Sequence, residues 1–356
     1  IRKIFKASRI IGRRFKLVHI FDRSELIEVA TFRSGEDISN EGNLITDQSG
    51  KILRDNIWGT LEQDTFRRDF TVNALYYCPI TKKIEDHNYG LEHIHKKIIV
   101  SIGDPKKRFE EDPVRSLRAI RFGNKLNFKL DKNIKEAIYK KGHLLSNISN
   151  ARLFDEFCKI FLNGMAEKNF NKLSSFDLYK YLVSVDPDKN EFTTKLIIEA
   201  LRNTDKRFKN NQSVTPGFLI AALLWPEIIE KSLKKGEINL RKFFRCMDQI
   251  LRKQQKITAV PRKFHSYIKD IWILQLKLHS RIGKQPYKTL KHPRFRAAYD
   301  FLLLREKAAN SKKNIGKWWT DFQTSDDSIK KILINNLREK NIEESSKTFG
   351  FSAELR

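Results

Sequence analysis

The spacing of hydrophobic residues along the chain changes near residue 105. Before that point the apolar runs are short and alternate with polar residues, as in FKLVHIF from Phe15 and LIEVATFR from Leu26. The polar break between these two runs predicts a β-hairpin. After Pro105 the apolar residues recur every three or four positions, which predicts helices almost throughout. The pattern therefore predicts an α+β protein, in which a small mixed sheet with helices precedes an all-helical remainder.

The β-rich part places one carboxylate on an otherwise apolar strand. In a strand that starts at Leu26, Glu28 points to the face opposite Ile27 and Val29, so its carboxylate is either exposed or functional. Further short strands are predicted in KKIEDH and KKIIVSI. The stretch from Ser34 to Asn56 is rich in Gly, Ser, Asn and Asp, which predicts a long mobile loop.

The stretch RRDFTVNALYY, which starts at Arg67, predicts a helix with a charged edge. Thr60 and Gln63 have the spacing of a capping box at the start of this helix. Arg67, Arg68 and Asp69 lie off its apolar face. That face consists of four residues at helical spacing, namely Phe66, Phe70, Asn73 and Tyr77.

The stretch EDPVRSLRAIRF, which starts at Glu111, predicts a second helix of this kind. Asp112 is the expected N-cap and Pro113 the expected first helical residue. Three arginines follow at steps of three along one side: Arg115, Arg118 and Arg121. The start of this helix therefore holds a carboxylate and several guanidinium groups together.

The later helices are predicted to build an apolar core. SVTPGFLIAALLW predicts a buried helix that is capped by Thr215 and begins with Pro216. Trp318 and Trp319 offer either a stacking platform for bases or a core anchor, and the anchor is the favoured interpretation. A helix further upstream is expected to leave Lys269 in solvent and to turn one stripe inward, consisting of Ile268, Ile271, Trp272, Gln275 and Leu278.

The charge of the chain points to a polyanionic partner. Lys and Arg number 70 against 43 Asp and Glu, which gives a net charge of +27 and a pI near 9.9. Nucleic acid is the commonest partner of so basic a protein, although a generally solvated lysine-rich surface is the alternative. The last third interleaves Lys and Arg with Phe, Tyr and Trp, which suits contact with an RNA backbone. An ordinary core with a solvated rim is the alternative for any single residue there.

Cysteine usage and apolar run length favour a protein of the cytoplasm without a membrane anchor. Cys78, Cys158 and Cys246 are widely spaced and form no CxxC pair, so neither a disulfide framework nor a zinc site is indicated. The longest apolar run, from Phe218 to Trp225, falls well short of the roughly 20 residues that span a bilayer. We expect no signal peptide before it.

Several stretches of the sequence resemble one enzyme family. RRDFTVNAL and EDPVRSLRAIRF, in this order, closely resemble motif blocks of the class II nucleotidyltransferases, which comprise bacterial poly(A) polymerases and tRNA nucleotidyltransferases (CCA-adding enzymes). IIGRRFKLVHI, from Ile10 to Ile20, is similar to the segment that marks the poly(A) polymerase branch. The similarity continues through KHPRFRAAYDFLLLR and KWWTDFQ, so the resemblance covers nearly the whole chain.

The resemblance also implies a domain organisation. A chain of 356 residues is expected to form two or three domains. In the resembling family these are a nucleotidyltransferase palm (head), a neck that recognises the base, a helical body and a basic RNA-binding region, at 1–104, 105–150, 151–260 and 261–356. The chain opens in mid-pattern at Ile1, and the family has a glycine-rich turn and a DxD carboxylate pair just upstream. We therefore expect the palm to be truncated at its N-terminus.

Nucleotidyl transfer requires two divalent metal ions held by carboxylates. The resemblance implies Mg²⁺ as cofactor and assigns Glu28 the position of the third metal-binding carboxylate, beside the DxD pair. A surface glutamate is the alternative from the sequence alone. Asp69 is the second candidate catalytic carboxylate, and a purely structural Arg–Asp pair is its alternative.

The nucleotide-binding candidates are mostly arginines, which donate bidentately to phosphate oxygens and keep their charge. The resemblance places Arg67, Arg68 and Asn73 near the nucleotide, and Arg118 at its triphosphate. Asp112 and Arg115 stand one helical turn apart, so one can accept from the N6 amino group of adenine while the other donates to N1. Cytosine presents the same pair of groups, so these two residues do not separate an A-adding enzyme from a CCA-adding one.

The function that the resemblance implies is template-independent addition of AMP from ATP to RNA 3′ ends, by a monomer that binds RNA and ATP and no membrane. A CCA-adding tRNA nucleotidyltransferase is the first alternative, and the stretch Ile10 to Ile20 and the long basic C-terminal region argue against it. The second alternative is a catalytically inactive RNA-binding fragment, because the DxD carboxylates are absent from this chain.

Overall fold

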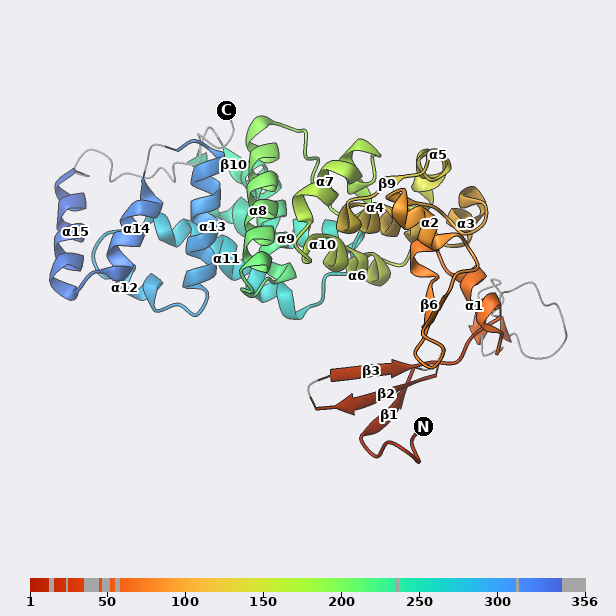
Figure 1. The fold of residues 1–356 in the computed structure, drawn as a ribbon. Coiled ribbons are helices and arrows are strands. Elements are labelled where there is room, and N and C mark those ends of the chain that lie inside the picture. The colour runs from red at the N-terminus through yellow and green to blue at the C-terminus, as the bar shows by residue number, and fades with distance from the viewer. Residues whose placement is uncertain are drawn as a thin grey trace. The chain divides into compact units, whose positions relative to one another are not determined.

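The chain, seen in a computed structural model, is described over residues 1–12, 16–23, 25–34, 45–46, 52–54, 58–234, 237–311 and 314–340. It divides into two compact units, Ile1–Lys141 and Gly142–Arg356 (Figure 1). The first unit holds the predicted head and most of the predicted neck, and the division into four regions stays a prediction. Most of the predicted loop and positions 13–15 of the stretch from Ile10 to Ile20 lie outside the described residues.

The described strands of the first unit form small separate sheets instead of one mixed sheet. Three antiparallel strands form the largest: β1 Ser8–Ile11, β2 Leu17–Asp22 and β3 Glu25–Val29. The others are two antiparallel pairs and one parallel pair: β4 Ile45–Thr46 with β5 Ile52–Arg54, β6 Tyr76–Cys78 with β7 Lys83–Glu85, and β8 Ile98–Ile99 with β9 Lys129–Leu130. The predicted hairpin and the α+β class are confirmed.

The predicted cap at Thr60 is confirmed, and a second side-chain cap lies at Asp104. Thr60 accepts from Gln63 N at the start of α1, and Asp104 accepts from Lys106 N at the start of α3. The helices are α1 Leu61–Arg67, the 3₁₀ turn η1 Thr71–Asn73, α2 Gly90–His95, α3 Pro105–Glu111, α4 Val114–Leu126 and α5 Lys132–Lys141. α3, α4 and α5 pack against one another.

The prediction of one helix through Tyr77 is wrong, because α1 ends at Arg67. Arg68 has extended backbone angles, and the next residues turn away to pair with the segment before α3. Phe70 bridges to Ser101, and Ile102 N donates to the carbonyl oxygen of Asp69 (3.1 Å). These long-range backbone bonds override the local helical spacing, and they bury Phe70 completely while leaving Tyr77 exposed.

The described part of the second unit is helical except for one short hairpin, and the predicted helical character is confirmed there. Its elements are η2 Gly142–Asn147, α6 Asn150–Phe161, α7 Ala166–Ser175, η3 Tyr179–Tyr181, α8 Glu191–Lys209, α9 Pro216–Ser232, β10 Leu233–Lys234, β11 Glu237–Ile238, α10 Leu240–Gln255, α11 Lys263–His279, α12 Gln285–Leu290, α13 Phe295–Ala308, α14 Ile315–Thr324 and α15 Asp327–Lys340. Thr215 caps α9 by accepting from Phe218 N (3.3 Å). Within the described residues, no helix has the length and apolar character of a membrane span.

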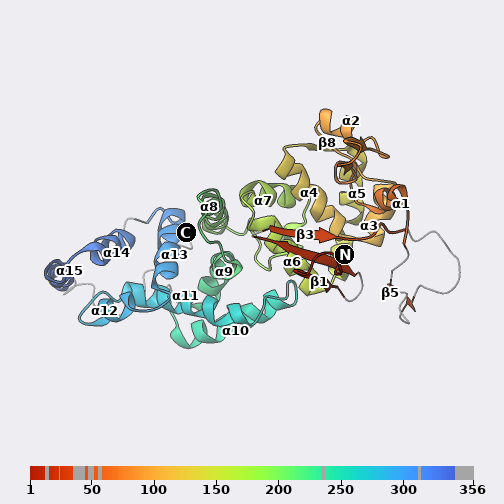
Figure 2. The same cartoon turned by 60° about the horizontal axis from the view of Figure 1, so that its bottom comes forward.

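The core of the second unit lies around α9, which packs against α8, α10 and α11, while α13 packs on α8 and α11 (Figure 1 and Figure 2). The inward stripe predicted on α11 is confirmed, and Trp272 within it donates to the carbonyl oxygen of Ala221 (2.9 Å). Trp319 is also completely buried and donates to the carbonyl oxygen of Leu278 (2.8 Å). The core-anchor interpretation of Trp318 and Trp319 is thus confirmed.

Candidate functional site

The candidate site is centred on the turn of Arg67, Arg68 and Asp69, where the chain leaves α1. The carboxylate of Asp69 is almost buried, with 8% of the residue exposed. Its Oδ1 accepts from Phe70 N (2.9 Å) and from Asn73 Nδ2 (3.2 Å), and its Oδ2 accepts from Arg118 Nε on α4 (2.6 Å). The ion pair with Arg118 compensates a charge that would otherwise be buried alone, and it joins the two sequence motifs.

The side chain of Arg108 on α3 binds backbone carbonyl groups of the same turn. Its Nη2 donates to the carbonyl oxygens of Arg67 (2.8 Å) and Arg68 (2.9 Å). Its Nη1 donates to Glu111 (2.8 Å), which also accepts from Arg115 (2.9 Å). Burial, together with the positive charge of Arg115, lowers the pKa of Arg108 below its ordinary value. A guanidinium still keeps its charge under such a shift, so α3 supplies a fixed cation at the end of α1.

A second buried carboxylate, Asp64, lies one turn earlier on α1. Its Oδ1 accepts from Arg67 Nη2 (3.0 Å), and its Oδ2 accepts from Arg68 Nη2 (3.3 Å) and from the hydroxyl of Tyr76. Burial alone would raise the pKa of Asp64, but the hydrogen bonds from Tyr76 and Arg67 outweigh it and lower this pKa below its usual value. Asp64 is therefore an anion in the folded protein.

The sequence interpretation missed Asp64, Tyr76 and Arg108. Asp64 precedes Arg67 and Arg68 by three and four residues, which is the spacing of ion pairs on a helix, so this signal was available. The contacts of Tyr76 and Arg108 depend on tertiary structure and carry no comparable signal in the sequence.

The predicted nucleotide-binding arginines differ in how many of their guanidinium donors form hydrogen bonds within the protein. Each of the three guanidinium nitrogens of Arg68 donates internally, to Tyr76, Asn73 and Asp64. Arg118 gives only Nε to Asp69, and among the described residues neither of its Nη atoms donates to a protein acceptor. Arg118 therefore has donors left for a ligand, whereas Arg68 shapes the turn.

Asp112 and Arg115 stand at the start of α4, close to where the sequence places them. The helix begins at Val114, one residue later than predicted, and Asp112 Oδ1 accepts from Val114 N (3.2 Å), so Asp112 does serve the helix start. Arg115 Nη1 also donates to the carbonyl oxygen of Arg108 (2.9 Å). Arg115 is thereby connected to the turn at Asp69 through Arg108.

Glu28 lies outside this cluster of contacts. It stands on β3 opposite His19 of β2, and its carboxylate, 64% exposed, lies 3.0 Å from His19 Nε2. None of the hydrogen bonds or ion pairs between described residues joins Glu28 to Asp69. The same described residues contain no group of three His, Cys, Asp or Glu side chains that could hold a metal ion.

Solved structures with this fold are enzymes that process tRNA. A tRNA-processing enzyme in an apo form matches with a TM-score of 0.61 and 17% identity over 94% of this chain and 83% of that chain. The Thermotoga maritima CCA-adding enzyme in complex with tRNA matches with a TM-score of 0.56 and 18% identity over 99% of this chain and 81% of that chain. The fold is therefore that of the CCA-adding enzymes and other tRNA-processing enzymes.

Sequence comparisons narrow this class to one family. Family models match in three places: the "Poly A polymerase head domain" at 1–100, the "Probable RNA and SrmB- binding site of polymerase A" at 127–188 and the "Polymerase A arginine-rich C-terminus" at 235–348. Poly(A) polymerase I of Salmonella typhi is 36% identical over 95% of this chain and 75% of its own length, and that of Haemophilus influenzae 38% over 94% and 76%. The chain belongs to the poly(A) polymerase I family.

The contacts of Asp64 predict the effect of replacing Tyr76 by Phe. The pKa of Asp64 is lowered in the folded protein, so its stabilisation is complete above the ordinary carboxyl pKa of about 3.9 and is lost as the pH falls through the folded pKa. Tyr76→Phe removes a donor to this anion, and we expect the free energy of unfolding to fall by about 1–2 kcal/mol at about pH 7. The difference from wild type should shrink at about pH 3. Urea unfolding measures both values.

Tyr77→Phe is the matched control, because the neighbouring Tyr77 is exposed and its hydroxyl makes no hydrogen bond among the described residues. We expect its stability to stay within about 0.5 kcal/mol of wild type. An equal loss in the two variants, or a loss for Tyr76→Phe that does not depend on pH, would contradict the role given to Asp64.

Proposed function

We propose that the protein is a polynucleotide adenylyltransferase, which adds AMP from ATP to RNA 3′ ends without a template and releases pyrophosphate. The observation that carries the proposal is the Asp69–Arg118 pair, which joins the two motifs of this enzyme class in one site. Membership in the poly(A) polymerase I family and the net charge of +27 support RNA as the substrate. We include RNA polyadenylation in mRNA processing and decay in the proposal.

In this proposal the arginines around Asp69 bind the triphosphate. Asp69 and Asn73 form one edge of the site, and the ion pair uses only Nε of Arg118, so its Nη groups would bind the phosphates. Arg67 gives Nη2 to Asp64 and its side chain is one-third exposed; among the described residues its Nη1 makes no hydrogen bond, which leaves a donor for a phosphate oxygen. Arg68 holds the turn in shape from its three internal contacts. We also propose that Asp69 has the catalytic role predicted from the sequence.

Asp112 and Arg115 would read the base. Both lie at the start of α4, on the helix that carries Arg118. The carboxylate of Asp112 would accept a hydrogen bond from the N6 amino group of adenine, and the guanidinium of Arg115 would donate one to N1. Because cytosine offers the same pair of groups, this contact leaves the choice between ATP and CTP to other residues.

Magnesium remains part of the proposal, with Glu28 as one of its ligands. Carboxylate oxygens suit Mg²⁺, and the carboxylate of Glu28 is exposed and lies 3.0 Å from His19 Nε2. The described residues do not make up a metal site by themselves, because no three His, Cys, Asp or Glu side chains among them are grouped together, and Asp69 already accepts three hydrogen bonds. Two Mg²⁺ ions would supply activation of the 3′ hydroxyl and neutralisation of pyrophosphate.

The cellular setting is also proposed. The three cysteines are free, as in a protein of the reducing cytoplasm. We propose a cytoplasmic monomer that binds ATP and RNA from solution.

The reaction product distinguishes the two nucleotidyl transfers. The full-length protein is incubated with ATP, CTP and Mg²⁺ and either tRNA that lacks CCA or an unrelated RNA, and the products are sized on a gel. We expect tails of many adenylates on both RNAs, and no dependence on CTP. A product that stops after CCA, and that forms only on tRNA, would assign the chain to the CCA-adding activity instead.

Replacing Arg118 by Gln tests the nucleotide contact. A hydrogen bond to a charged group contributes about 1.5–3 kcal/mol, and each 1.4 kcal/mol changes an equilibrium constant tenfold, so the KM for ATP should rise about 10- to 100-fold. Steady-state adenylation at saturating RNA measures it. Lys125→Gln, an exposed site on the same helix, is the control and should leave this KM unchanged. If the two variants have the same KM, Arg118 does not contact the nucleotide.

A further inference from the structure

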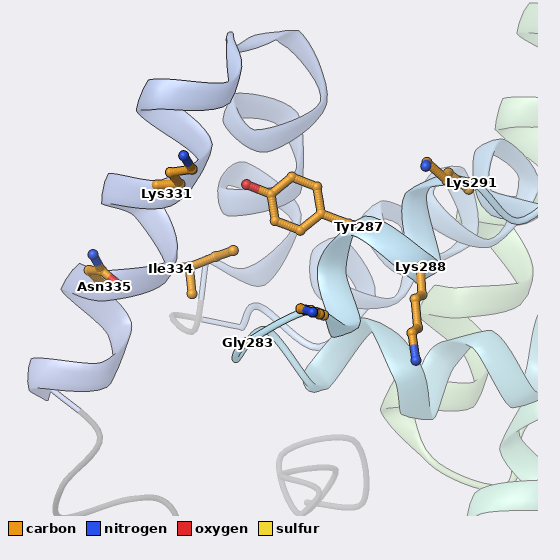
Figure 3. A pocket seen from close by; sticks show the side chains of 8 residues that line it. Gly283, Tyr287, Lys288, Lys291, Lys331, Ile334 and Asn335 are labelled. Carbon is orange, nitrogen blue, oxygen red and sulfur yellow. The ribbon is translucent and has the colours of Figure 1, made fainter.

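Two hollows of the second unit differ in size and lining. The larger one, of about 680 Å³, lies between α12 and α15, and four lysines line it (Figure 3). It falls within the basic region for which RNA contact is already predicted. The smaller one, of about 210 Å³, lies where α8, α9, α11 and α13 meet, and each of these helices packs against two of the others (Figure 1). We call it the arginine pocket after Arg207, Arg294 and Arg296, which line it.

The arginine pocket carries more positive than negative charge. Among the described residues that line it, Asp300 has the only carboxylate. Asp300 pairs with Nε of Arg296 (3.0 Å) and lies 3.7 Å from Nη1 of Arg207. One carboxylate leaves two of the three guanidinium charges uncompensated, and guanidinium groups stay charged in proteins. The pocket therefore attracts an anion.

Two of the arginines have donors left for such an anion. The guanidinium of Arg294 makes no hydrogen bond or ion pair with a described residue and lies over the ring of Tyr267, 4.9 Å from its centre. Nε of Arg207 donates to the carbonyl oxygen of Ser213 (3.0 Å), while its Nη2 makes no hydrogen bond within the described part of the chain. Because Arg207 is already ordered, less side-chain entropy is lost when a ligand binds.

The N-termini of two helices add to the positive charge of the pocket. α9 begins behind its cap Thr215, α13 begins behind Arg294, and both of these residues line the pocket. The N-terminus of a helix carries partial positive charge and unpaired N–H groups. No side-chain cap bonds to the first turn of α13, so its amides are not satisfied in that way.

One wall of the pocket is aromatic and firmly held. Phe218 packs edge to face on Phe301, with ring centres 6.4 Å apart. Tyr267 lies so close to α9 that a Cβ atom at Gly217 would be 2.9 Å from its Cδ1. Such a wall suits a flat organic group that is attached to the anion.

We propose that the arginine pocket binds a small organic phosphate. The phosphate accepts from Arg207 and Arg294, since arginine matches phosphate oxygens in geometry and charge, and the organic part packs on Phe218. The volume of 210 Å³ lies below the roughly 300–1,000 Å³ of sites for drug-sized ligands, so the organic part is about one ring in size. An RNA strand would instead require a groove that follows successive phosphates. The site goes beyond the proposed function and does not depend on it.

Phenyl phosphate is the probe, because it joins a phosphate to a single flat ring. Calorimetric titration of the full-length protein should show saturable binding with a Kd of about 1 mM or tighter. Inorganic phosphate should bind at least about tenfold more weakly, because it has no group that packs on the aromatic wall. Lack of saturable binding, or equal affinity for the two compounds, would overturn the proposal.

Replacing Arg294 by Gln tests the phosphate contact. The side chain is exposed, so the melting temperature should not change, whereas the loss of a hydrogen bond to a charged group should raise the Kd for phenyl phosphate about 10- to 100-fold. Arg252→Gln, at an exposed position of α10 outside the pocket, removes the same charge and should keep the wild-type Kd. So should Arg118→Gln, which alters the proposed nucleotide site. Equal changes for Arg294→Gln and either control would contradict the assignment.

Competition with RNA distinguishes a small ligand from a strand. A labelled oligo(A) of roughly 16 nucleotides should bind Arg294→Gln as tightly as wild type and should not displace phenyl phosphate. If oligo(A) displaces it, or binds the variant more weakly, the pocket contacts the RNA backbone and the proposal is wrong. Binding requires no catalysis, so a protein that adds no AMP but binds phenyl phosphate through Arg294 would refute the proposed function and keep this site.

Discussion

The ion pair between Asp69 and Arg118 is the interaction on which the first unit depends. Its two residues are 49 positions apart, and only 2.6 Å separates the carboxylate oxygen from the guanidinium nitrogen. A carboxylate as buried as that of Asp69 is costly unless it is paired and hydrogen-bonded, and Asn73 and the Phe70 amide supply the remaining donors. The pair therefore fixes the turn after α1 against α4 and decides where the arginines of both motifs lie.

The neighbouring contacts extend the same arrangement to both sides. Arg108 binds the carbonyl oxygens of Arg67 and Arg68, which lie at the end of α1, where a helix favours cations. Asp64 holds the side chains of those two arginines from within the helix. Several cations are thus collected around two buried anions and keep fixed positions without a ligand. Such a preorganised set of donors suits a triphosphate, because the arginine side chains do not have to be ordered when the ligand binds.

The sequence predicts those parts of the molecule that local spacing determines. The capping box of Thr60 and the inward stripe of α11 depend on neighbours within a few residues, and both agree with the structure. The helix expected to start at Asp112 and Pro113 begins one residue later, at Val114. The helix expected through Tyr77 does not form, because the backbone of Phe70 forms an antiparallel β-bridge with the distant Ser101. The hydrogen bonds from Arg108 to the turn and the pairing of Glu28 with His19 form between segments that are distant in the sequence. The order of residue types along the chain does not specify which distant segments come into contact.

A double-mutant cycle between Asp69→Asn and Arg118→Gln tests the central claim most directly. The readout is hydrogen exchange of the Ile102 amide, which donates to the carbonyl oxygen of Asp69 and reports the local opening of the turn. The account predicts a coupling free energy of about 1–2 kcal/mol between the two sites. Additive effects of the two substitutions would show that the turn and α4 do not depend on each other, and would contradict it.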